Sequence, residues 1–205
     1  LAAVPNQVIQ GYQNMAQMAG LELYALEAEA MSVARALVKD NKKTICLLDI
    51  GAQSTTINII DKGKIKKSYS FNFAAGQLTH AVASALGIAY NEAEEIKRKE
   101  GLSSKNESVS KNLYLLIDHI LLEVKKILIN FYQSDGKEID EIYLTGGTSN
   151  LPGLKEYFVE VLKKKVEIPN CFSDLLYPPI LEETIEKMSP SFSVAVGAAL
   201  EGLET

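Results

Sequence analysis

Residues 45–61 constrain the fold of this chain more than any other stretch, because two short apolar runs there flank a polar turn. The runs are rich in β-branched residues and have the length of strands. Lys62 and Gly63 then turn the chain into a third strand, expected over residues 64–73. The stretch therefore predicts a β-meander whose first turn carries the chemistry.

The first turn, residues 49–55, combines an acid and a glycine with small or amide side chains. Gly51 lets another group approach the backbone closely, and successive exposed N–H groups in such a turn form an anion-binding nest. Asp49 stands where the first strand ends, so its carboxylate is placed to hold a metal ion or a water molecule. The turn therefore predicts an anion site with a cation or water beside it.

Length and composition limit the classes of protein to consider. The chain has 205 residues, enough for one large domain or two small lobes, and 47% of them are hydrophobic, as in ordinary globular proteins. A net charge of −5 does not support a nucleic-acid-binding protein. Cys46 and Cys171 lie in apolar contexts without metal-ligand spacing, which predicts reduced, buried thiols in a cytosolic protein.

Other signals are weak. His80 and His119 are too few and too far apart to predict a metal site or a catalytic pair. No apolar run approaches the roughly 20 residues of a membrane span, and no signal peptide is recognisable. The sequence begins at Leu1 without an initiator methionine, so we expect a fragment that lacks a preceding lobe.

The remaining pattern predicts alternating helices and strands. Helices are expected over residues 5–19, 27–38, 77–86, 92–100, 111–132, 152–164 and 190–200. Further strands are expected over residues 21–26, 141–145 and 166–168, and loops over 103–110 and 170–179. Asn91 is the expected N-cap of the helix that follows it. The lysines at 163–165 end a helix, where positive charge suits the helix dipole; contact with a membrane surface is the alternative interpretation.

A second loop matches the first in character. Gly146 and Gly147 join a strand to a helix, so that a flat or anionic ligand can lie against the backbone with a helix N-terminus aimed at it. Most diglycine loops are only turns, so this signal is weak alone.

In this order, and about 90 residues apart, the two loops resemble the second phosphate loop and the adenosine loop of the actin–Hsp70–sugar-kinase superfamily. Within it the chain resembles most the type IV pilus assembly protein PilM family, with the division protein FtsA as a close relative. The segments that carry the resemblance are residues 4–5, 19–22, 27–37, 48–55, 76–87, 92–97, 123–132, 143–154 and 193–200.

The resemblance implies an α/β fold: an actin-like (ribonuclease H-like) ATPase lobe whose mixed five-stranded sheet carries helices on both faces. It assigns residues 1–40 to the end of a first lobe and an interlobe helix. Residues 41–205 would form the second lobe and end in a second interlobe helix.

ATP and Mg²⁺ are the implied cofactors. The residues implied for the β- and γ-phosphates are the backbone of the first turn and the hydroxyl that supports it: Gly51, Ala52, Gln53, Ser54 and Thr55. Asp49 would act through a hydrated Mg²⁺, which keeps several waters and accepts carboxylates. Glu27 stands where the superfamily often has an acid or amide that positions the attacking water, although an ordinary glutamate at a helix N-terminus is the alternative.

The nucleoside side would be formed by three further groups of residues: Gly76 and Gln77; Glu94, Lys97 and Arg98; Gly146, Gly147, Thr148 and Ser149. Glu94, Lys97 and Arg98 share one helical face, and a solvated charged face is the alternative for them. Departures from the family pattern occur at residues 52–53 and 74–77. The first phosphate loop is absent, so this chain alone is expected to bind ATP poorly and hydrolyse it negligibly.

The resemblance implies an ATP-binding scaffold of type IV pilus, or related secretion or competence, assembly at the cytoplasmic face of the inner membrane. Its nucleotide state would be coupled to the tail of a PilN-like inner-membrane protein, held by the lobe that is missing here. A pilus motor ATPase and a second copy are further implied partners. The alternatives are an FtsA-like division filament protein, an actin-fold phosphotransferase, or a degenerate domain that binds no nucleotide. Residues 201–205 supply no amphipathic helix of the kind that an FtsA-like protein needs.

Overall fold

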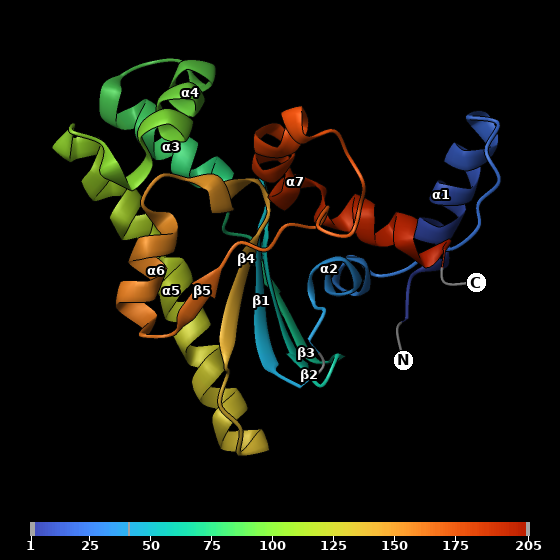
Figure 1. Cartoon of the computed structure of the whole chain (residues 1–205). Helices are drawn as coiled ribbons and strands as arrows, with labels where there is room; N and C mark the ends of the chain where they lie inside the picture. The colour runs from blue at the N-terminus through green and yellow to red at the C-terminus, as the bar shows by residue number, and fades with distance from the viewer. Residues whose placement is uncertain (1–2, 41, 204–205) are drawn as a thin grey trace.

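A computed structural model describes residues 3–40 and 42–203 of the chain (Figure 1). The helices are α1 (Asn6–Met18), α2 (Glu29–Leu37), α3 (Ala75–Leu86), α4 (Tyr90–Glu100), α5 (Glu107–Asp135), α6 (Leu154–Leu162) and α7 (Glu182–Glu201). The strands are β1 (Thr44–Ile50), β2 (Thr55–Asp61), β3 (Lys64–Phe71), β4 (Glu141–Thr145) and β5 (Lys165–Glu167). Short 3₁₀ turns are η1 (Gly101–Ser103), η2 (Gly147–Asn150) and η3 (Pro179–Leu181).

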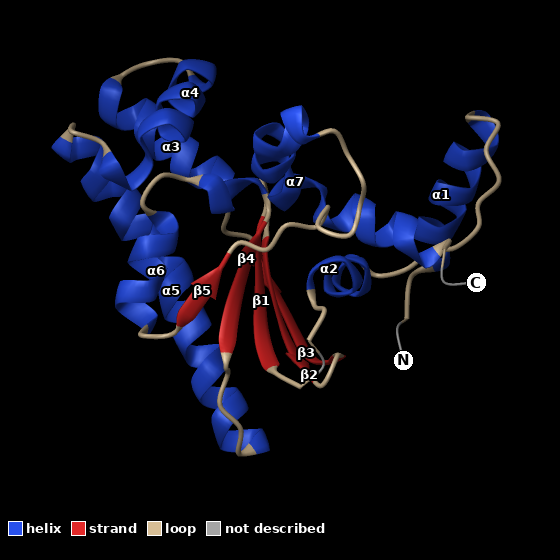
Figure 2. Cartoon of the chain, viewed as in Figure 1, coloured by secondary structure: helices blue, strands red, loops and turns tan. Residues whose placement is uncertain are grey.

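β1 is the central strand of a five-stranded sheet with the order β3-β2-β1-β4-β5. It pairs antiparallel with β2 and parallel with β4, so the sheet is mixed. Every residue of β1 except Asp49 is buried, because α5 and α6 cover one face of the sheet and α2 covers the other (Figure 2). The predicted mixed five-stranded sheet with helices on both faces is confirmed.

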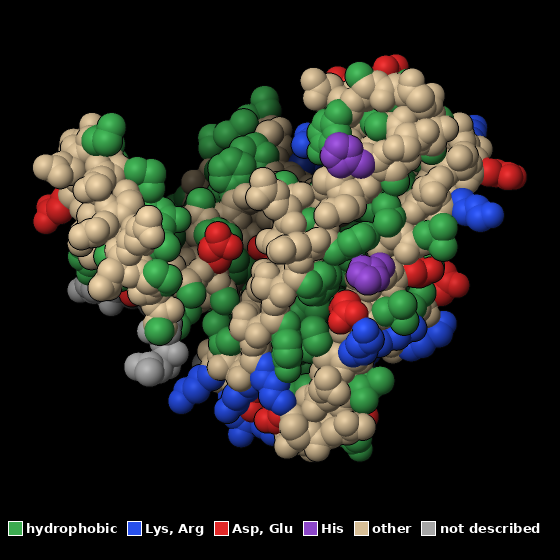
Figure 3. Space-filling model, turned by 180° about the vertical axis from the view of Figure 1, so that it is seen from behind, with side chains coloured by type: hydrophobic (Ala, Val, Ile, Leu, Met, Phe, Trp, Pro, Cys, Tyr) green, Lys and Arg blue, Asp and Glu red, His purple; other side chains and the backbone are tan. Residues whose placement is uncertain are grey.

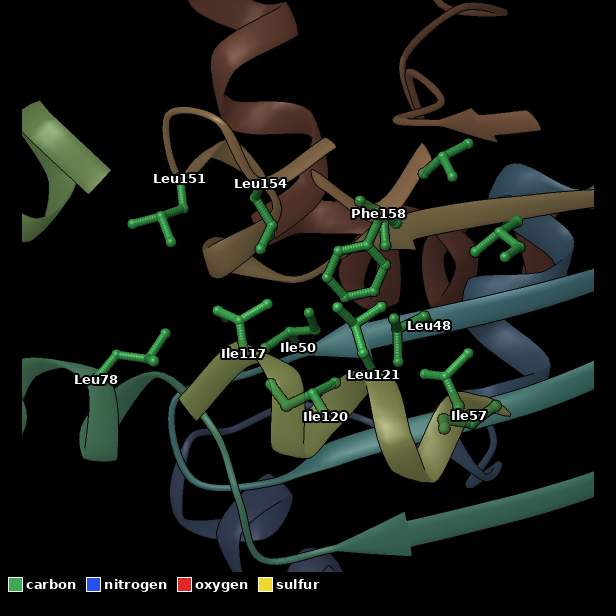
Figure 4. Packing of buried hydrophobic residues seen from close by; sticks show 14 of the residues in the cluster. Leu48, Ile50, Ile57, Leu78, Ile117, Ile120, Leu121, Leu151, Leu154 and Phe158 are labelled. Carbon is green, nitrogen blue, oxygen red and sulfur yellow. The ribbon is translucent and has the colours of Figure 1, made fainter. Parts of the chain in front are cut away.

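The larger core lies between the sheet and α5. Leu48 of β1 packs with Ile117 and Leu121 of α5, and Phe158 of α6 closes the cluster (Figure 4). Leu47 points to the opposite face and joins the smaller cluster under α2, as the two-residue period of a strand requires. α5 has 29 residues, yet within residues 3–40 and 42–203 no helix combines the length and apolarity needed to cross a membrane.

α2 and α7 cross at Gly197. A Cβ at this position would overlap the backbone carbonyl of Ser32, so only glycine permits such a close approach. Arg35 of α2 fastens the crossing: its guanidinium donates to the Gly197 carbonyl oxygen (2.8 Å) and to the Glu27 carboxylate (2.7 and 2.9 Å). It also pairs with Glu201 of α7. The crossing is thus held by both shape and charge.

The predicted strand at residues 21–26 is wrong. This segment is irregular, and its side chains are all exposed. The sheet ends at β3 and β5, so no strand lies beside the segment to accept its backbone hydrogen bonds. An alternating pattern without a partner strand does not form stable β-structure.

Helices α5 and α4 begin earlier than predicted. α5 starts directly after Asn106, whose side-chain oxygen accepts hydrogen bonds from the N–H groups of Ser108 (3.0 Å) and Val109 (3.3 Å). The predicted loop therefore ends at residue 106 and not at 110. α4 starts at Tyr90, so Asn91 lies inside the helix and does not cap it.

α7 also begins earlier, at Glu182, and continues through Pro190, the residue at which the helix is predicted to start. Proline lacks an N–H group and normally breaks a helix. Here the Pro190 carbonyl oxygen accepts hydrogen bonds from the Gly146 N–H (2.9 Å) and the Thr145 hydroxyl (3.1 Å). These bonds tie α7 to the loop that follows β4.

The other predicted elements agree with the structure to within about two residues at each end, a normal tolerance for helix and strand boundaries. Cys46 and Cys171 are both buried and free, which confirms the predicted reduced, buried thiols. α1 has no buried residue. The division of the chain at residue 40 stays a prediction, and residue 41 lies outside the described residues.

Gly197→Ala should destabilise the protein by about 3 kcal/mol, because the added methyl group forces two packed helices apart. Urea unfolding followed by circular dichroism measures this change in the free energy of unfolding. Gly11→Ala is the matched control: Gly11 lies in α1 with open space around it, so alanine should stabilise the helix by up to about 1 kcal/mol. Unchanged stability of Gly197→Ala would contradict the close crossing.

Candidate functional site

A pocket with a volume of about 890 Å³ opens at the C-terminal ends of β1 and β4. Its walls come from three regions that are distant in the sequence: the β1–β2 turn, the α3–α4 pair, and η2 with the N-terminal half of α7. The lining residues are Gly51, Ala52, Ala75, Gly76, Tyr90, Glu94, Lys97, Arg98, Gly147, Thr148, Asn150, Leu151, Lys187 and Ser191.

The β1–β2 turn is docked on the N-terminus of α3. The carbonyl oxygens of Gly51 and Ala52 accept hydrogen bonds from the N–H groups of Ala75 (3.1 Å) and Gly76 (3.0 Å). These bonds satisfy N–H groups that every helix leaves unpaired in its first turn. The turn and the helix are therefore one rigid unit, and Gly51, Ala52 and Gly76 reach the pocket wall together.

Other predicted residues of this region support the turn and do not line the pocket. The Thr55 hydroxyl donates to the Phe73 carbonyl oxygen (2.5 Å). The Gln77 side-chain oxygen accepts a hydrogen bond from the Ala74 N–H (2.9 Å) and so caps α3. Gln53 and Ser54 belong to the turn but lie outside the lining residues.

Asp49 and Gly146 bring the two predicted loops into contact. Gly146 has a φ of +82°, and a Cβ there would overlap the Asp49 carboxylate and lie 2.5 Å from the Ile50 carbonyl oxygen. Burial, with a smaller contribution from Glu29, raises the pKa of Asp49 to about 6. Across residues 3–40 and 42–203 the Asp49 carboxylate has no hydrogen-bond partner. A cation beside it would relieve this unpaired charge.

Glu94, Lys97 and Arg98 form one network with Thr79 of α3. The Glu94 carboxylate accepts hydrogen bonds from the Lys97 ammonium (2.6 Å), the Thr79 hydroxyl (2.5 Å) and the Arg98 guanidinium (2.7 Å). Burial raises the pKa of Glu94, but these three bonds outweigh it and bring the pKa down to about 2. Lys97 is 4% exposed, so a solvated face does not explain this residue, whereas the Arg98 side chain is 78% exposed.

The η2 loop offers a second unsatisfied group. The Thr148 hydroxyl is buried and has no hydrogen-bond partner in the described parts of the chain. Ser149 is also buried, but its hydroxyl donates to the Gly146 carbonyl oxygen (2.7 Å) and so serves the turn. A Cβ at Gly147 would meet only the Ser191 hydroxyl, at 3.5 Å, so this wall has room for a ligand.

Glu27 lies outside the pocket lining. Its carboxylate is held by Arg35 (2.7 Å) and also accepts a hydrogen bond from the Ser32 hydroxyl. Glu29, in the first turn of α2, is the acid whose charge acts on Asp49. A role for Glu27 in positioning water stays a prediction, and it requires the ion pair with Arg35 to open.

Six lining residues were not predicted. One is Ala75, next to the predicted Gly76, and the other five are Tyr90, Asn150, Leu151, Lys187 and Ser191. Asn150 and Leu151 directly follow the predicted Ser149, so a wider window around the diglycine would have included them. Lys187 lies in the part of α7 that was not predicted to be helical. Tyr90 lies just before the predicted start of α4, and no local pattern marks it as a ligand contact.

The pocket suits a nucleotide with a bound cation. Its phosphate side would be the β1–β2 turn, and its polar and charged α4 face matches a ribose or base. The described residues contain no group of three or more His, Cys, Asp or Glu that could hold a metal ion. A single unpaired Asp49 fits Mg²⁺, because this ion keeps several waters and binds through one or two carboxylates together with substrate phosphates.

Asp49→Asn should stabilise the protein at neutral pH. The folded pKa of about 6 lies above the ordinary value of 3.8, so the folded state loses stability as pH rises between these values. At pH 7.5 the variant should gain up to about 3 kcal/mol, and at pH 4 little. Urea unfolding at both pH values measures this. Asp174→Asn is the control, because Lys39 lowers the pKa of Asp174, and a similar gain there would contradict the assignment.

Comparisons with known proteins identify the fold. The cell division protein FtsA of Staphylococcus epidermidis is 20% identical over an alignment of 213 positions that covers 93% of this chain and 46% of that protein. The solved PilM-PilN type IV pilus biogenesis complex is 23% identical with a TM-score of 0.83, covering 96% of this chain and 58% of that chain. MreB 5 of Spiroplasma citri, solved bound to AMPPNP, is 17% identical with a TM-score of 0.73, covering 99% and 67%.

The predicted actin-like ATPase fold is confirmed by these structures. The chain spans about half the length of the curated relatives it matches. A family model described as type IV pilus assembly protein PilM matches residues 6–203. The chain therefore belongs to the type IV pilus assembly protein PilM family.

Proposed function

We propose that the chain is the ATP-binding lobe of an actin-like scaffold for type IV pilus assembly, or for a related secretion or competence system. The observation that carries the proposal is the convergence of the β1–β2 turn, the α4 face and the η2 loop on one pocket. Membership of the PilM family supports the pilus assignment. The place of action would be the cytoplasmic face of the inner membrane.

Different residues would contact different parts of the nucleotide. Gly51 and Ala52 would present backbone to the β- and γ-phosphates, and Asp49 would hold the waters of a bound Mg²⁺, which neutralises phosphate charge. Lys97 is fixed by Glu94 and Thr79, so it can contact ribose or base without reorganising. The unpaired Thr148 hydroxyl would gain a hydrogen bond from the ligand, an advantage for a buried polar group.

Any ATPase activity should be slow. Glu27 is the predicted residue for orienting the attacking water, but Arg35 and Ser32 occupy its carboxylate. A slow or absent reaction suits a scaffold whose nucleotide state changes its affinity for a partner. The proposed partner is the tail of a PilN-like inner-membrane protein, because a PilM structure of the same fold was solved with PilN.

Calorimetry with Mg·ATP tests the site, on this chain and on the full-length gene product in parallel. The full-length protein should bind with micromolar affinity, about −8 kcal/mol. Asp49→Ala and Gly146→Val should each weaken binding at least tenfold. Gly136→Val is the matched control for Gly146→Val: Gly136 also has a positive φ, +67°, but open space around it. Folded Asp49→Ala and Gly146→Val proteins with undiminished binding would refute the site.

A synthetic PilN-like tail tests the partner. Fluorescence anisotropy should show that the labelled tail binds the full-length protein, with an affinity that differs between Mg·ATP and Mg·ADP. A scrambled tail is the control. A division protein is the second candidate, because FtsA proteins are among the relatives of this chain. Filament formation with ATP, together with no binding of the tail, would favour the division protein over the pilus scaffold. Rapid phosphate transfer to a sugar would instead favour a phosphotransferase.

A further inference from the structure

Lysines gather at the end of the sheet opposite the pocket. Four segments bring them there: the entry to β1, the β2–β3 hairpin with β3, the α5–β4 loop, and the entry to β5. They are Lys42, Lys43, Lys62, Lys64, Lys66, Lys67, Lys137, Lys163, Lys164 and Lys165. We call this surface the lysine end; Figure 3 shows blue side chains gathered at the lower end of the molecule.

Strand register places these segments together. Thr44 at the start of β1 pairs with Asp61, which pairs in turn with Lys64 of β3. On the other side, Ile45 pairs with Glu141, and Glu141 pairs with Lys165 of β5. The lysine end therefore runs across the whole width of the sheet.

The lysine end is positive in a chain that is negative overall. It carries ten of the 21 Lys and Arg residues but only seven of the 26 Asp and Glu residues, and the net charge of the chain is −5. The seven acids are Asp40, Asp61, Asp135, Glu138, Asp140, Glu141 and Glu167. Charge is thus separated along the sheet, so net charge alone does not describe how this protein meets a charged surface.

Ion pairs neutralise only half of these lysines. Glu141 binds both Lys43 (3.0 Å) and Lys165 (2.9 Å), and Asp61 binds Lys137 (2.7 Å). Lys67 pairs with Asp135 and Lys164 with Glu138. The other five are exposed and have no ion-pair partner in the described parts of the chain: Lys42, Lys62, Lys64, Lys66 and Lys163. These five charges remain available to a partner.

Turn geometry does not account for the lysine at the tip of the β2–β3 hairpin. Lys62 has a φ of +53° and Gly63 a φ of +71°, a pair of left-handed residues at which asparagine, aspartate or glycine is preferred. Lysines on the edge strand β3 do discourage pairing with other chains, which accounts for Lys64 and Lys66. Edge protection does not explain Lys42 or Lys163, which lie on other loops.

We propose that the lysine end docks this protein on an anionic phospholipid surface. Its cations are all lysines, compact point charges suited to diffuse attraction, whereas arginine is preferred for bidentate recognition of phosphate and nucleic acid. Tyr69 and Phe71 of β3 pack against the core and are not presented for base stacking. A broad array of unpaired cations without such specific contacts matches a lipid headgroup layer better than a nucleic acid. The contact is independent of the nucleotide site.

Vesicle flotation tests the proposal with the chain itself. The protein should float with vesicles of phosphatidylcholine containing about one third phosphatidylglycerol and not with pure phosphatidylcholine, because the attraction needs anionic lipid. Binding should fall steeply as salt rises from about 50 to 500 mM, since salt screens exposed charges. If the charges were instead spread evenly over the protein, its net charge of −5 would cause repulsion from anionic vesicles. The protein would then not float with them.

A matched pair of triple variants locates the surface. Lys62→Gln, Lys64→Gln and Lys66→Gln together should weaken vesicle binding on the order of a hundredfold, at roughly fivefold per lysine. The control is Lys105→Gln, Lys111→Gln and Lys125→Gln: these lysines are also exposed and unpaired in the described structure, but they lie away from the lysine end. The control should bind within about twofold of the unchanged protein. Circular dichroism confirms that both variants are folded.

Several results would overturn the proposal. Absence of flotation with anionic vesicles at low salt would do so, as would equal losses in the two triple variants. Tighter binding to duplex DNA than to vesicles would assign the lysine end to nucleic acid. Sedimentation would detect self-association through the lysine end. Self-association that is lost in the Lys62, Lys64 and Lys66 variant would assign this surface to a second copy of the chain. None of these outcomes depends on whether the pocket binds ATP.

Discussion

Burial of β1 on both faces is the constraint on which the rest of the structure depends. A strand with apolar side chains on both sides needs a layer on each face, and the chain supplies α5 and α6 on one and α2 on the other. The exception within β1 is Asp49. Because the strand is fixed on all sides, its C-terminal end holds Asp49 against Gly146 and leads into the turn that lines the pocket, while its N-terminal end carries lysines outward.

α7 connects the pocket to the α2 crossing. Lys187 and Ser191 line the pocket, the Pro190 carbonyl oxygen holds Gly146, and Gly197 lies against Ser32. These contacts fall within three turns of one helix. A ligand that shifts the loop around Gly146 must therefore either strain the bonds to Pro190 or move α7 against α2. This is a direct physical route from the pocket to the crossing of α2 and α7.

The polar and charged groups in and beside the pocket fall into two kinds, those that are paired with one another and those that are unpaired. Glu94 and Lys97 neutralise one another inside a network of short bonds, so they form a rigid wall that is complete without a ligand. Within the described residues, neither the Asp49 carboxylate nor the Thr148 hydroxyl has a hydrogen-bond partner. Unpaired buried groups cost stability, and a protein retains them where a ligand supplies the missing partner. The unsatisfied groups flank Gly146, between the β1–β2 turn and the η2 loop.

The sequence alone determined the β-meander and the two glycine loops, because strand periodicity and glycine backbone freedom are local properties. The mixed five-stranded sheet followed from the resemblance to the actin-like fold, since strand periodicity also predicted a strand at residues 21–26. The sequence also marked the helix face of Glu94, Lys97 and Arg98. Only the tertiary structure decided which residues meet. It joined Glu27 to Arg35, turned Gln77 into a helix cap, brought Tyr90 and Lys187 to the pocket, and left residues 21–26 without a strand partner. Each of these outcomes depends on a neighbour distant in sequence or on a helix boundary, which a local pattern cannot encode.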